Sequence, residues 1–178
     1  MSREAVIVSA NLALLEQAYE LLGRMPDSAY AGAENAEKPV GPQFRHVIDH
    51  YSCFLEGQCG GRIDYDARRR EAAIETDREA ARARIRGLIA GLTVLDPALL
   101  DIPADARLEC GWGEEDDQWS RTSVRRELHF LLSHTIHHYA LIGLLLARHG
   151  LDPGPEFGVA PSTLKFWRSR TACAPQAG

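Results

Sequence analysis

The chain has 178 residues, of which 45% are hydrophobic and 25% are charged. This is the composition of a globular protein, and the length suits a single domain built on one hydrophobic core. Lys and Arg number 20 against 25 Asp and Glu, which gives a formal net charge of -5. Because no basic excess is available to neutralise a phosphate backbone, nucleic-acid binding is not expected. We expect one domain over residues 1–178.

Neither the apolar segments nor the cysteines indicate a membrane or secreted protein. The longest apolar stretch, residues 139–147, contains a glycine and is far shorter than the about 20 residues that span a bilayer. The N-terminal segment lacks an apolar run followed by a small-residue cleavage site. The cysteines show no repeated CxxC spacing. They are Cys53, Cys59, Cys110 and Cys173. We therefore expect reduced thiols in a cytoplasmic protein that does not bind membranes.

The first half of the chain predicts two long helices. Apolar residues recur at three- and four-residue steps over residues 4–24, and small polar residues in 26–39 then predict a loop. A Gly-Pro pair at 41–42 opens a second helix that runs to about Glu56, because proline is favoured in a first turn. Residues 62–74, which contain three consecutive arginines, are expected to form a partly ordered surface loop with a solvated basic face.

The second half predicts two more helices and a small hairpin. A third helix is capped near Thr76 and runs to about Val94. Two short strands, 107–110 and 118–121, can flank the turn sequence GWGEEDD. Thr122 or Ser123 then caps a fourth helix that ends at Gly150, and residues 150–178 form an irregular tail. A short segment of this tail, 162–167, is expected to cap one end of the bundle.

These elements predict an all-α protein, an up-down four-helix bundle with one long crossover. The fourth helix is apolar over most of its circumference, through Phe130, Leu141 and Leu144 as well as its main apolar face. An apolar flank of this kind has to be covered, either by the tail or by a second copy of the chain. We therefore expect a homodimer.

The fourth helix carries two histidines on its inward face. Each helical residue turns by about 100°, so residues four apart lie about 40° apart on one face. His134 and His138 fall near the middle of the apolar arc that includes Leu131 and Ile142. His137 lies about 100° from His138 and competes with its neighbours as a possible ligand.

The second helix offers two further histidines. His50 borders Val47 and Phe54 on the apolar side, whereas His46 lies one step toward the polar side. His50 is therefore the better inward candidate. Cys53 lies near the same seam and is expected to be an inert buried thiol rather than a nucleophile.

This pattern predicts a metal site. Two imidazoles from one helix turn and a third from a facing helix form a three-nitrogen site suited to zinc, nickel, iron or manganese. We expect His50, His134 and His138 to bind one divalent transition metal, with His46 as a competing ligand. Because ligation requires neutral imidazole, affinity should fall below about pH 6.5. The alternative is that these histidines only form hydrogen bonds within the core.

Other catalytic motifs are absent from the sequence. It contains no HExxH, no pair of ExxH helices, no GxSxG, no Walker loop and no GxGxxG. Zincin, di-iron, serine-hydrolase and nucleotide-binding functions therefore lack support. No residue is assigned a catalytic role, and His46 is the only nearby titratable candidate for a general base.

The segments GPQFRHVIDHYSCFLEG and RELHFLLSHTIHHYALIG together resemble the DinB-like superfamily of four-helix metalloproteins. That family places one histidine on the second helix and an HxxxH on the fourth, a pattern that carries over to His50, His134 and His138. The tail GVAPSTLKF is similar to the ending of bacterial members. The family is catalytically diverse and includes thiol-dependent transferases.

The resemblance implies either a metal-dependent thiol transferase or a hydrolase acting on a small molecule, with a low-molecular-weight thiol as a possible partner. The alternative is a non-catalytic protein, a metal-dependent small-molecule-binding or stress-response module, whose ligand is not turned over.

Overall fold

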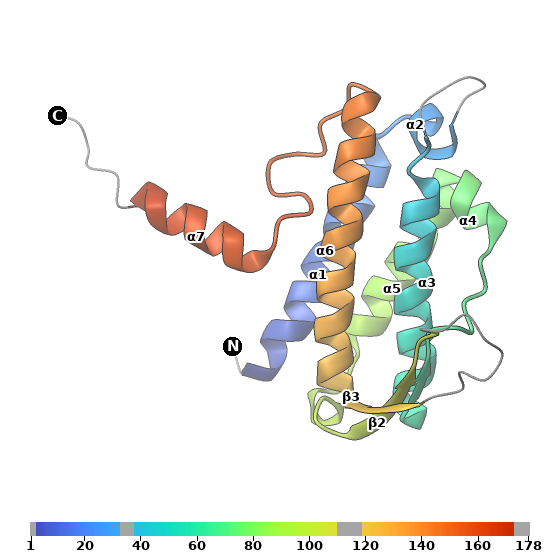
Figure 1. Ribbon diagram of the computed structural model, residues 1–178, viewed down its shortest axis with the longest axis vertical. Coiled ribbons are helices and arrows are strands. Elements are labelled where there is room, and N and C mark those ends of the chain that lie inside the picture. The colour runs from blue at the N-terminus through green and yellow to red at the C-terminus, as the bar shows by residue number, and fades with distance from the viewer. Residues whose placement is uncertain (1–2, 33–37, 110–118, 173–178) are drawn as a thin grey trace.

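A computed structural model describes residues 3–32, 38–109 and 119–172. Its body is a bundle of four long helices (Figure 1). They are α1 (Arg3–Arg24), α3 (Gly41–Gly57), α5 (Arg78–Thr93) and α6 (Val124–Arg148). α1 and α3 each pack against both α5 and α6. The predicted all-α class and the bounds of these helices are confirmed to within a few residues.

The helices do not simply alternate in direction. α1 and α6 run one way, and α3 and α5 run the other (Figure 1). Two successive long helices are parallel because the chain leaves the end of α3 and crosses back along the bundle through residues 65–71. It then enters the short α4 (Ala72–Thr76), which leads into α5. The expected long crossover is therefore the connection between α3 and α5. A Cβ atom at Gly41 would lie 2.0 Å from the Glu75 carbonyl oxygen, so glycine permits the close approach of α4 to the start of α3.

Side-chain caps set the starts of α5 and α6. Asp77, rather than Thr76, accepts hydrogen bonds from the backbone N–H groups of Glu79 and Ala80. Ser123 accepts one from the backbone N–H of Arg126, which confirms one of the two expected caps. The remaining short helical elements are α2 (Asp27–Ala31), η1 (Gln58–Gly60) and η2 (Pro97–Leu99).

A three-stranded sheet closes one end of the bundle, next to the last turn of α3 and the first turn of α6 (Figure 1). The predicted hairpin exists, but its strands are β2 (Pro103–Arg107) and β3 (Ser120–Ser123), with Ala106 paired to Ser120. The predicted turn, GWGEEDD, lies outside the described residues.

A third strand, β1 (Arg62–Asp64), pairs in parallel with β2. The expectation of a partly ordered loop over 62–74 was therefore wrong for this part of the chain. Ile63 and Tyr65 alternate with exposed or half-buried residues, and both side chains are buried in the core. The segment is too short to give a clear period-two pattern, and its pairing depends on a strand about 40 residues away.

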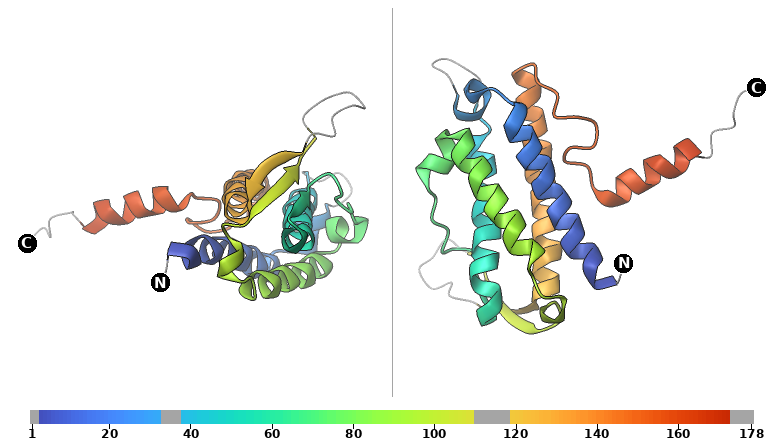
Figure 2. Two further views of the ribbon diagram at one scale, coloured as in Figure 1. Left: turned by 90° about the horizontal axis from the view of Figure 1, so that it is seen from below. Right: turned by 180° about the vertical axis from the view of Figure 1, so that it is seen from behind.

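The C-terminal tail contains a longer helix than expected. α7 (Pro161–Ala172) projects away from the bundle and does not cap its end (Figure 2). The covering contact comes from an earlier tail residue, since the Phe157 ring stacks on Tyr139 of α6 at 4.5 Å between centroids. Leu144 on α6 and Phe166 and Trp167 on α7 remain exposed.

α6 is long and apolar enough to cross a membrane by length and composition, and it is the one helix in the described ranges with this property. In the folded chain it is a bundle helix. Leu128, Leu131, Ile142 and Leu146 are fully buried against the other helices. This part of the apolar surface of α6 therefore contributes to the core.

A buried hydrogen-bond network joins α1, α3 and α6. Tyr51 of α3 donates to the Asn11 side-chain oxygen at 2.7 Å, and Asn11 in turn donates to the Leu128 carbonyl at 3.1 Å. Thr135 of α6 donates to the Tyr51 hydroxyl at 3.4 Å. Because each buried polar group has a partner here, the network fixes the helices relative to one another without a large desolvation cost.

We expect Tyr51→Phe to lower the free energy of unfolding by about 1–3 kcal/mol, because the Asn11 oxygen would be left buried without a donor. Chemical denaturation measures the change. The matched control is Tyr19→Phe, at a partly exposed ring, where a change within about 0.5 kcal/mol is expected. Equal effects of the two substitutions would show that the network does not contribute to stability.

The homodimer remains a prediction, and the structure indicates where to test it. Leu144 of α6 is 68% exposed and borders a hollow lined also by Leu141 and Leu145. We expect Leu144→Glu to convert the dimer into a monomer in light scattering at micromolar concentration. Val94→Glu, at a residue 81% exposed elsewhere on the surface, is the control and should leave the dimer intact. A monomeric wild-type protein would contradict the prediction.

Candidate metal centre

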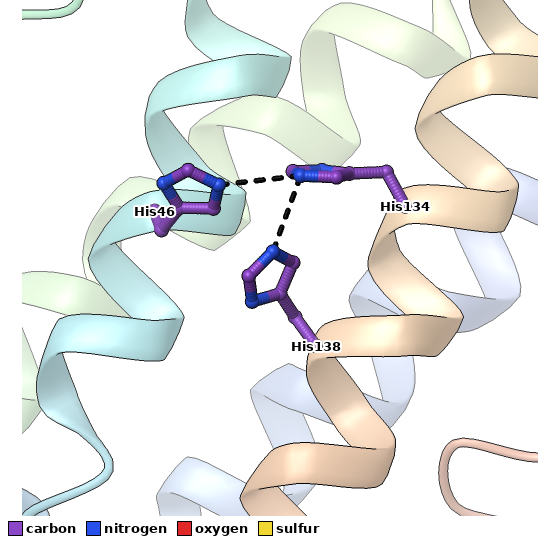
Figure 3. Close-up of side chains that lie close together, drawn as sticks. All are labelled: His46, His134 and His138. Atoms are coloured by element: carbon purple, nitrogen blue, oxygen red, sulfur yellow. Dashed lines mark hydrogen bonds between the residues drawn. The ribbon is translucent and has the colours of Figure 1, made fainter.

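Three histidine side chains converge between α3 and α6 (Figure 3). The Nε2 atom of His134 lies 3.2 Å from Nε2 of His46 and 3.1 Å from Nε2 of His138. The three donor atoms all lie within 4.8 Å of one another. We call His46, His134 and His138 the three-histidine group. Within the described residues it is the one set of His, Cys, Asp and Glu side chains with this geometry.

The helical spacing explains this arrangement. His134 and His138 are one turn apart on α6, so both imidazoles project from the same face toward α3, as the sequence predicts. His46 reaches them from α3, although the sequence places it nearer the polar side of that helix. All three side chains are half-buried, so the group is sheltered by the bundle and still open to solvent.

One hydrogen bond leaves a nitrogen lone pair, on Nε2 of His138, directed into the group. Gln43 Oε1, which can only accept, lies 2.7 Å from Nδ1 of His138. His138 therefore carries its proton on Nδ1, and its Nε2 presents a lone pair to His134. Nδ1 of His134 is buried without a hydrogen-bond partner. The distances of 3.1 and 3.2 Å are hydrogen-bond distances, so without a cation Nε2 of His134 forms hydrogen bonds with its two neighbours. A cation between the three atoms would replace these bonds and use all three lone pairs.

His50 is the most buried of the four histidines at this site, at 2% exposed, but it lies beside the group. Its Nδ1–H donates to the His46 carbonyl at 2.8 Å, which leaves its Nε2 unprotonated. Its ring centroid is 4.3 Å from that of His134 and 4.4 Å from that of His46. The expected inward direction of His50 is thus confirmed, but the closest set of donor atoms uses His46. His137 is exposed, and its ring contacts His138 edge-on.

Burial keeps these imidazoles neutral. Desolvation, together with the repulsion that the neighbouring imidazoles would feel if charged, lowers the pKa of His46 and of His134 to about 3. Desolvation likewise lowers the pKa of His50 and of His138 to about 4. Neutral imidazole is the form that binds a metal, so the protein holds these side chains ready for ligation at physiological pH.

A buried carboxylate orders the wall next to His50. Glu127 is 6% exposed and accepts hydrogen bonds from the Tyr65 hydroxyl at 2.9 Å and from Thr122 at 2.6 Å. The Tyr65 ring stacks on His50, at 5.5 Å between centroids, and contacts Phe130 at 5.2 Å. Burial and the nearby carboxylate raise the pKa of Tyr65 well above its usual range, so its hydroxyl remains a donor.

A hollow of about 290 Å³ shares three of these side chains, Tyr65, Glu127 and Phe130. Tyr65 and Phe130 line it, and the Phe130 ring also stacks on His134 at 5.3 Å. Arg107, Arg126 and Glu127 supply polar groups to its wall. A space of this size accommodates a small organic molecule within reach of the aromatic side chains that border the histidines.

The sequence missed one charged residue at the site, Arg68. Arg68 lies on the crossover segment that follows β1. Its Nη1 atom is 3.5 Å from Nδ1 of His46. The arginine run was expected to be solvated. This is true of Arg69, which is exposed and forms an ion pair with Glu56, but Arg68 is half-buried. Nothing in a run of three arginines indicates which of them faces a helix more than twenty residues away.

Cys53 lies outside the three-histidine group. Burial, reinforced by Glu56 and Asp49, raises the pKa of its thiol to about 11. A thiol in this state is a poor nucleophile and a poor ligand at neutral pH. Cys53 and Cys59 are both free thiols.

The sequence matches the model of the DinB superfamily over residues 13–142. This range includes the second half of α1, all of α3 and α5, most of α6, the sheet and every member of the three-histidine group. The chain is also 33% identical over 103 residues to a protein named FK506-binding protein 5 from Rhizopus delemar. That match covers 58% of this chain and 27% of the fungal protein, so the chain corresponds to about a quarter of that relative. No solved structure matches the chain.

The low pKa values shift the expected pH dependence of metal binding. The sequence alone predicts loss of affinity below about pH 6.5, whereas pKa values of about 3 to 4 mean that protons compete effectively only at much lower pH. We expect metal binding to persist at pH 5 and to be lost as the pH approaches 4. Equilibrium dialysis with zinc from pH 7 to pH 3.5 measures it.

Circular dichroism at each pH is the control for this titration. A histidine whose pKa is lower in the folded than in the unfolded state stabilises the fold fully above about pH 6.5. That contribution declines as the pH falls toward the folded-state pKa. Loss of metal while the protein is still fully folded at pH 6 would contradict the prediction.

Proposed function

This chain belongs to the DinB superfamily, and on that basis we propose that it binds one divalent transition metal and uses it to act on a small molecule. The proposed ligands are His46, His134 and His138. The observation that carries the proposal is the convergence of three Nε2 atoms, one of which has its tautomer fixed by Gln43. Zinc, nickel, iron and manganese are the candidate ions, and nitrogen donors suit the first three best.

His46 replaces His50 as the proposed ligand from α3. The sequence favours His50 because of its apolar neighbours, and the family pattern requires only one histidine from that helix. The distances support His46, while His50 donates to the His46 carbonyl and thereby supports the backbone of the ligand next to it. His50 is then left with an unprotonated Nε2 beside the group.

Three protein ligands leave coordination positions for water or substrate. A bound divalent metal supplies Lewis acidity and lowers the pKa of a coordinated water or thiol. The protein contributes a sheltered, half-buried setting, neutral imidazoles and one further base. We propose that Nε2 of His50 accepts the proton released by the substrate or by water, because its Nδ1–H donates to the His46 carbonyl and its Nε2 is left unprotonated beside the group.

The proposed reaction is thiol transfer or hydrolysis, with a low-molecular-weight thiol as the favoured substrate. The hollow bordered by Tyr65 and Phe130 supports a small organic substrate. The free thiols of Cys53 and Cys59 support action in the reducing cytoplasm. The alternative is a binding protein whose small-molecule ligand occupies the open position without being turned over.

Metal analysis tests the ligand set. Protein purified without an affinity tag should contain about one metal per chain, and His46→Ala, His134→Ala and His138→Ala should each lower the affinity by about tenfold or more. His50→Ala should retain the metal. His137→Ala is the matched control, because it removes an exposed histidine from the same helix turn. Full metal content in the His134→Ala, His138→Ala double variant would refute the site, and loss only in His50→Ala would identify His50 as the ligand.

Turnover tests the reaction. The protein loaded with zinc, nickel, manganese or iron is assayed with a panel of small thiols and a generic electrophile. We expect metal-dependent product formation that His50→Ala lowers by about 10²-fold or more while the metal stays bound. The absence of turnover with every metal, together with metal-dependent thermal stabilisation by a thiol, would favour the binding protein.

A further inference from the structure

Arg68 places a positive charge at the edge of the three-histidine group. Its Nη1 atom is 3.5 Å from Nδ1 of His46, and its side chain is half-buried. Its Nε is enclosed and has no hydrogen-bond partner. A guanidinium in this position is costly unless something negative binds to it, because burial removes part of its hydration.

The carboxylates around this part of the bundle are already paired with other arginines. Arg45 binds Asp49 and Glu75, Arg84 binds Glu71, Arg69 binds Glu56, and Arg107 binds Asp64 and Asp66. Arg68 forms no ion pair with any carboxylate in residues 3–32, 38–109 and 119–172. Its charge is therefore unbalanced on the side that faces the histidines.

The electrostatic potential at the three-histidine group would be strongly positive with a divalent metal bound. The imidazoles are neutral ligands, so a divalent ion keeps its full charge, and the guanidinium adds one more. Like charges this close repel each other in a partly desolvated site. An anion that touches both the guanidinium and the open face of the group would remove this repulsion, whereas a neutral ligand would not.

We propose that Arg68 binds the carboxylate of a small organic anion whose reactive end reaches the three-histidine group. The planar fork of N–H donors on arginine matches a carboxylate, and a charged pair of this kind is shorter and stronger than a neutral hydrogen bond. This inference rests on the proposed function and narrows its substrate to anionic molecules. Arg68 positions the substrate and takes no part in bond making or breaking.

The test compares two probes of nearly the same size, the anion mercaptoacetate and the neutral mercaptoacetamide. Isothermal titration calorimetry measures the affinity of each probe for wild-type protein, with and without zinc. The ratio of the two affinities is the readout, because differences in thiol acidity between the probes are the same for every variant and cancel. We expect wild-type protein to prefer mercaptoacetate, and Arg68→Gln to reduce the ratio by about tenfold, as expected for one charged hydrogen bond.

Matched variants separate this role from a general effect of charge. Arg69→Gln removes the same charge from the next residue, which is exposed and paired with Glu56, and should leave the ratio unchanged. Arg126→Gln removes an arginine from the wall of the proposed substrate hollow and tests whether the anion binds there instead of at Arg68. Arg68→Lys should restore part of the preference. In Arg68→Gln and Arg69→Gln the affinity for the neutral amide should stay at the wild-type level, and the zinc content should not fall.

The possible failures are distinguishable. Wild-type protein without a preference for mercaptoacetate, or an Arg68→Gln variant that keeps the preference, would overturn the inference. So would loss of the preference in Arg126→Gln alone, which would assign the anion to the hollow. If the protein binds no metal, the proposed function fails, and the affinity ratio in the metal-free protein still decides whether Arg68 recognises the anion.

Discussion

The register between α3 and α6 is the constraint on which the site depends. Three imidazoles from two helices can place their nitrogens within a few ångströms of one another only if the helices are fixed along and around their axes. Tyr51 and Thr135 hydrogen-bond to each other, and each directly follows a histidine of the site, His50 or His134. Gln43 and His138 form a second link between the same helices. The polar contacts that stabilise the core therefore also position the donor atoms.

The small sheet extends this control to the crossover segment. β1 begins the return path from the end of α3, and the buried side chains of Ile63 and Tyr65 attach that path to the core. Tyr65 is held by Glu127 and stacks on His50, so the sheet, the start of α6 and the histidines form one connected unit. Arg68 follows three residues later, which explains how a residue from an otherwise polar loop comes to lie against His46.

The charges at the site favour a cation and an anion together. Four neutral, half-buried or buried histidines offer nitrogen lone pairs but no compensating negative charge. The nearby carboxylates are used in ion pairs with arginines other than Arg68. A bundle fold does not by itself specify a reaction, so the placement of these few groups carries the functional argument.

The sequence by itself determined the four long helices, the cap at Ser123 and the HxxxH of α6, and it placed the cap of α5 one residue early, at Thr76. Apolar periodicity and capping chemistry are local properties of the chain. It also identified both histidines of α3, and the resemblance to the DinB superfamily is confirmed over residues 13–142. The helices, the cap and the histidine spacing each depend on neighbours within a few residues.

Only the tertiary structure decided which of the α3 histidines meets His134 and His138, how β1 joins the sheet, and that Arg68 faces the site. His50 has the more apolar neighbours and is indeed the more buried, but burial does not determine where a nitrogen points. The rotation of α3 against α6, set by contacts such as that of Tyr51 with Thr135, brings His46 into the group instead. β1 and Arg68 likewise depend on pairing and packing between segments far apart in the chain, and no local pattern encodes those contacts.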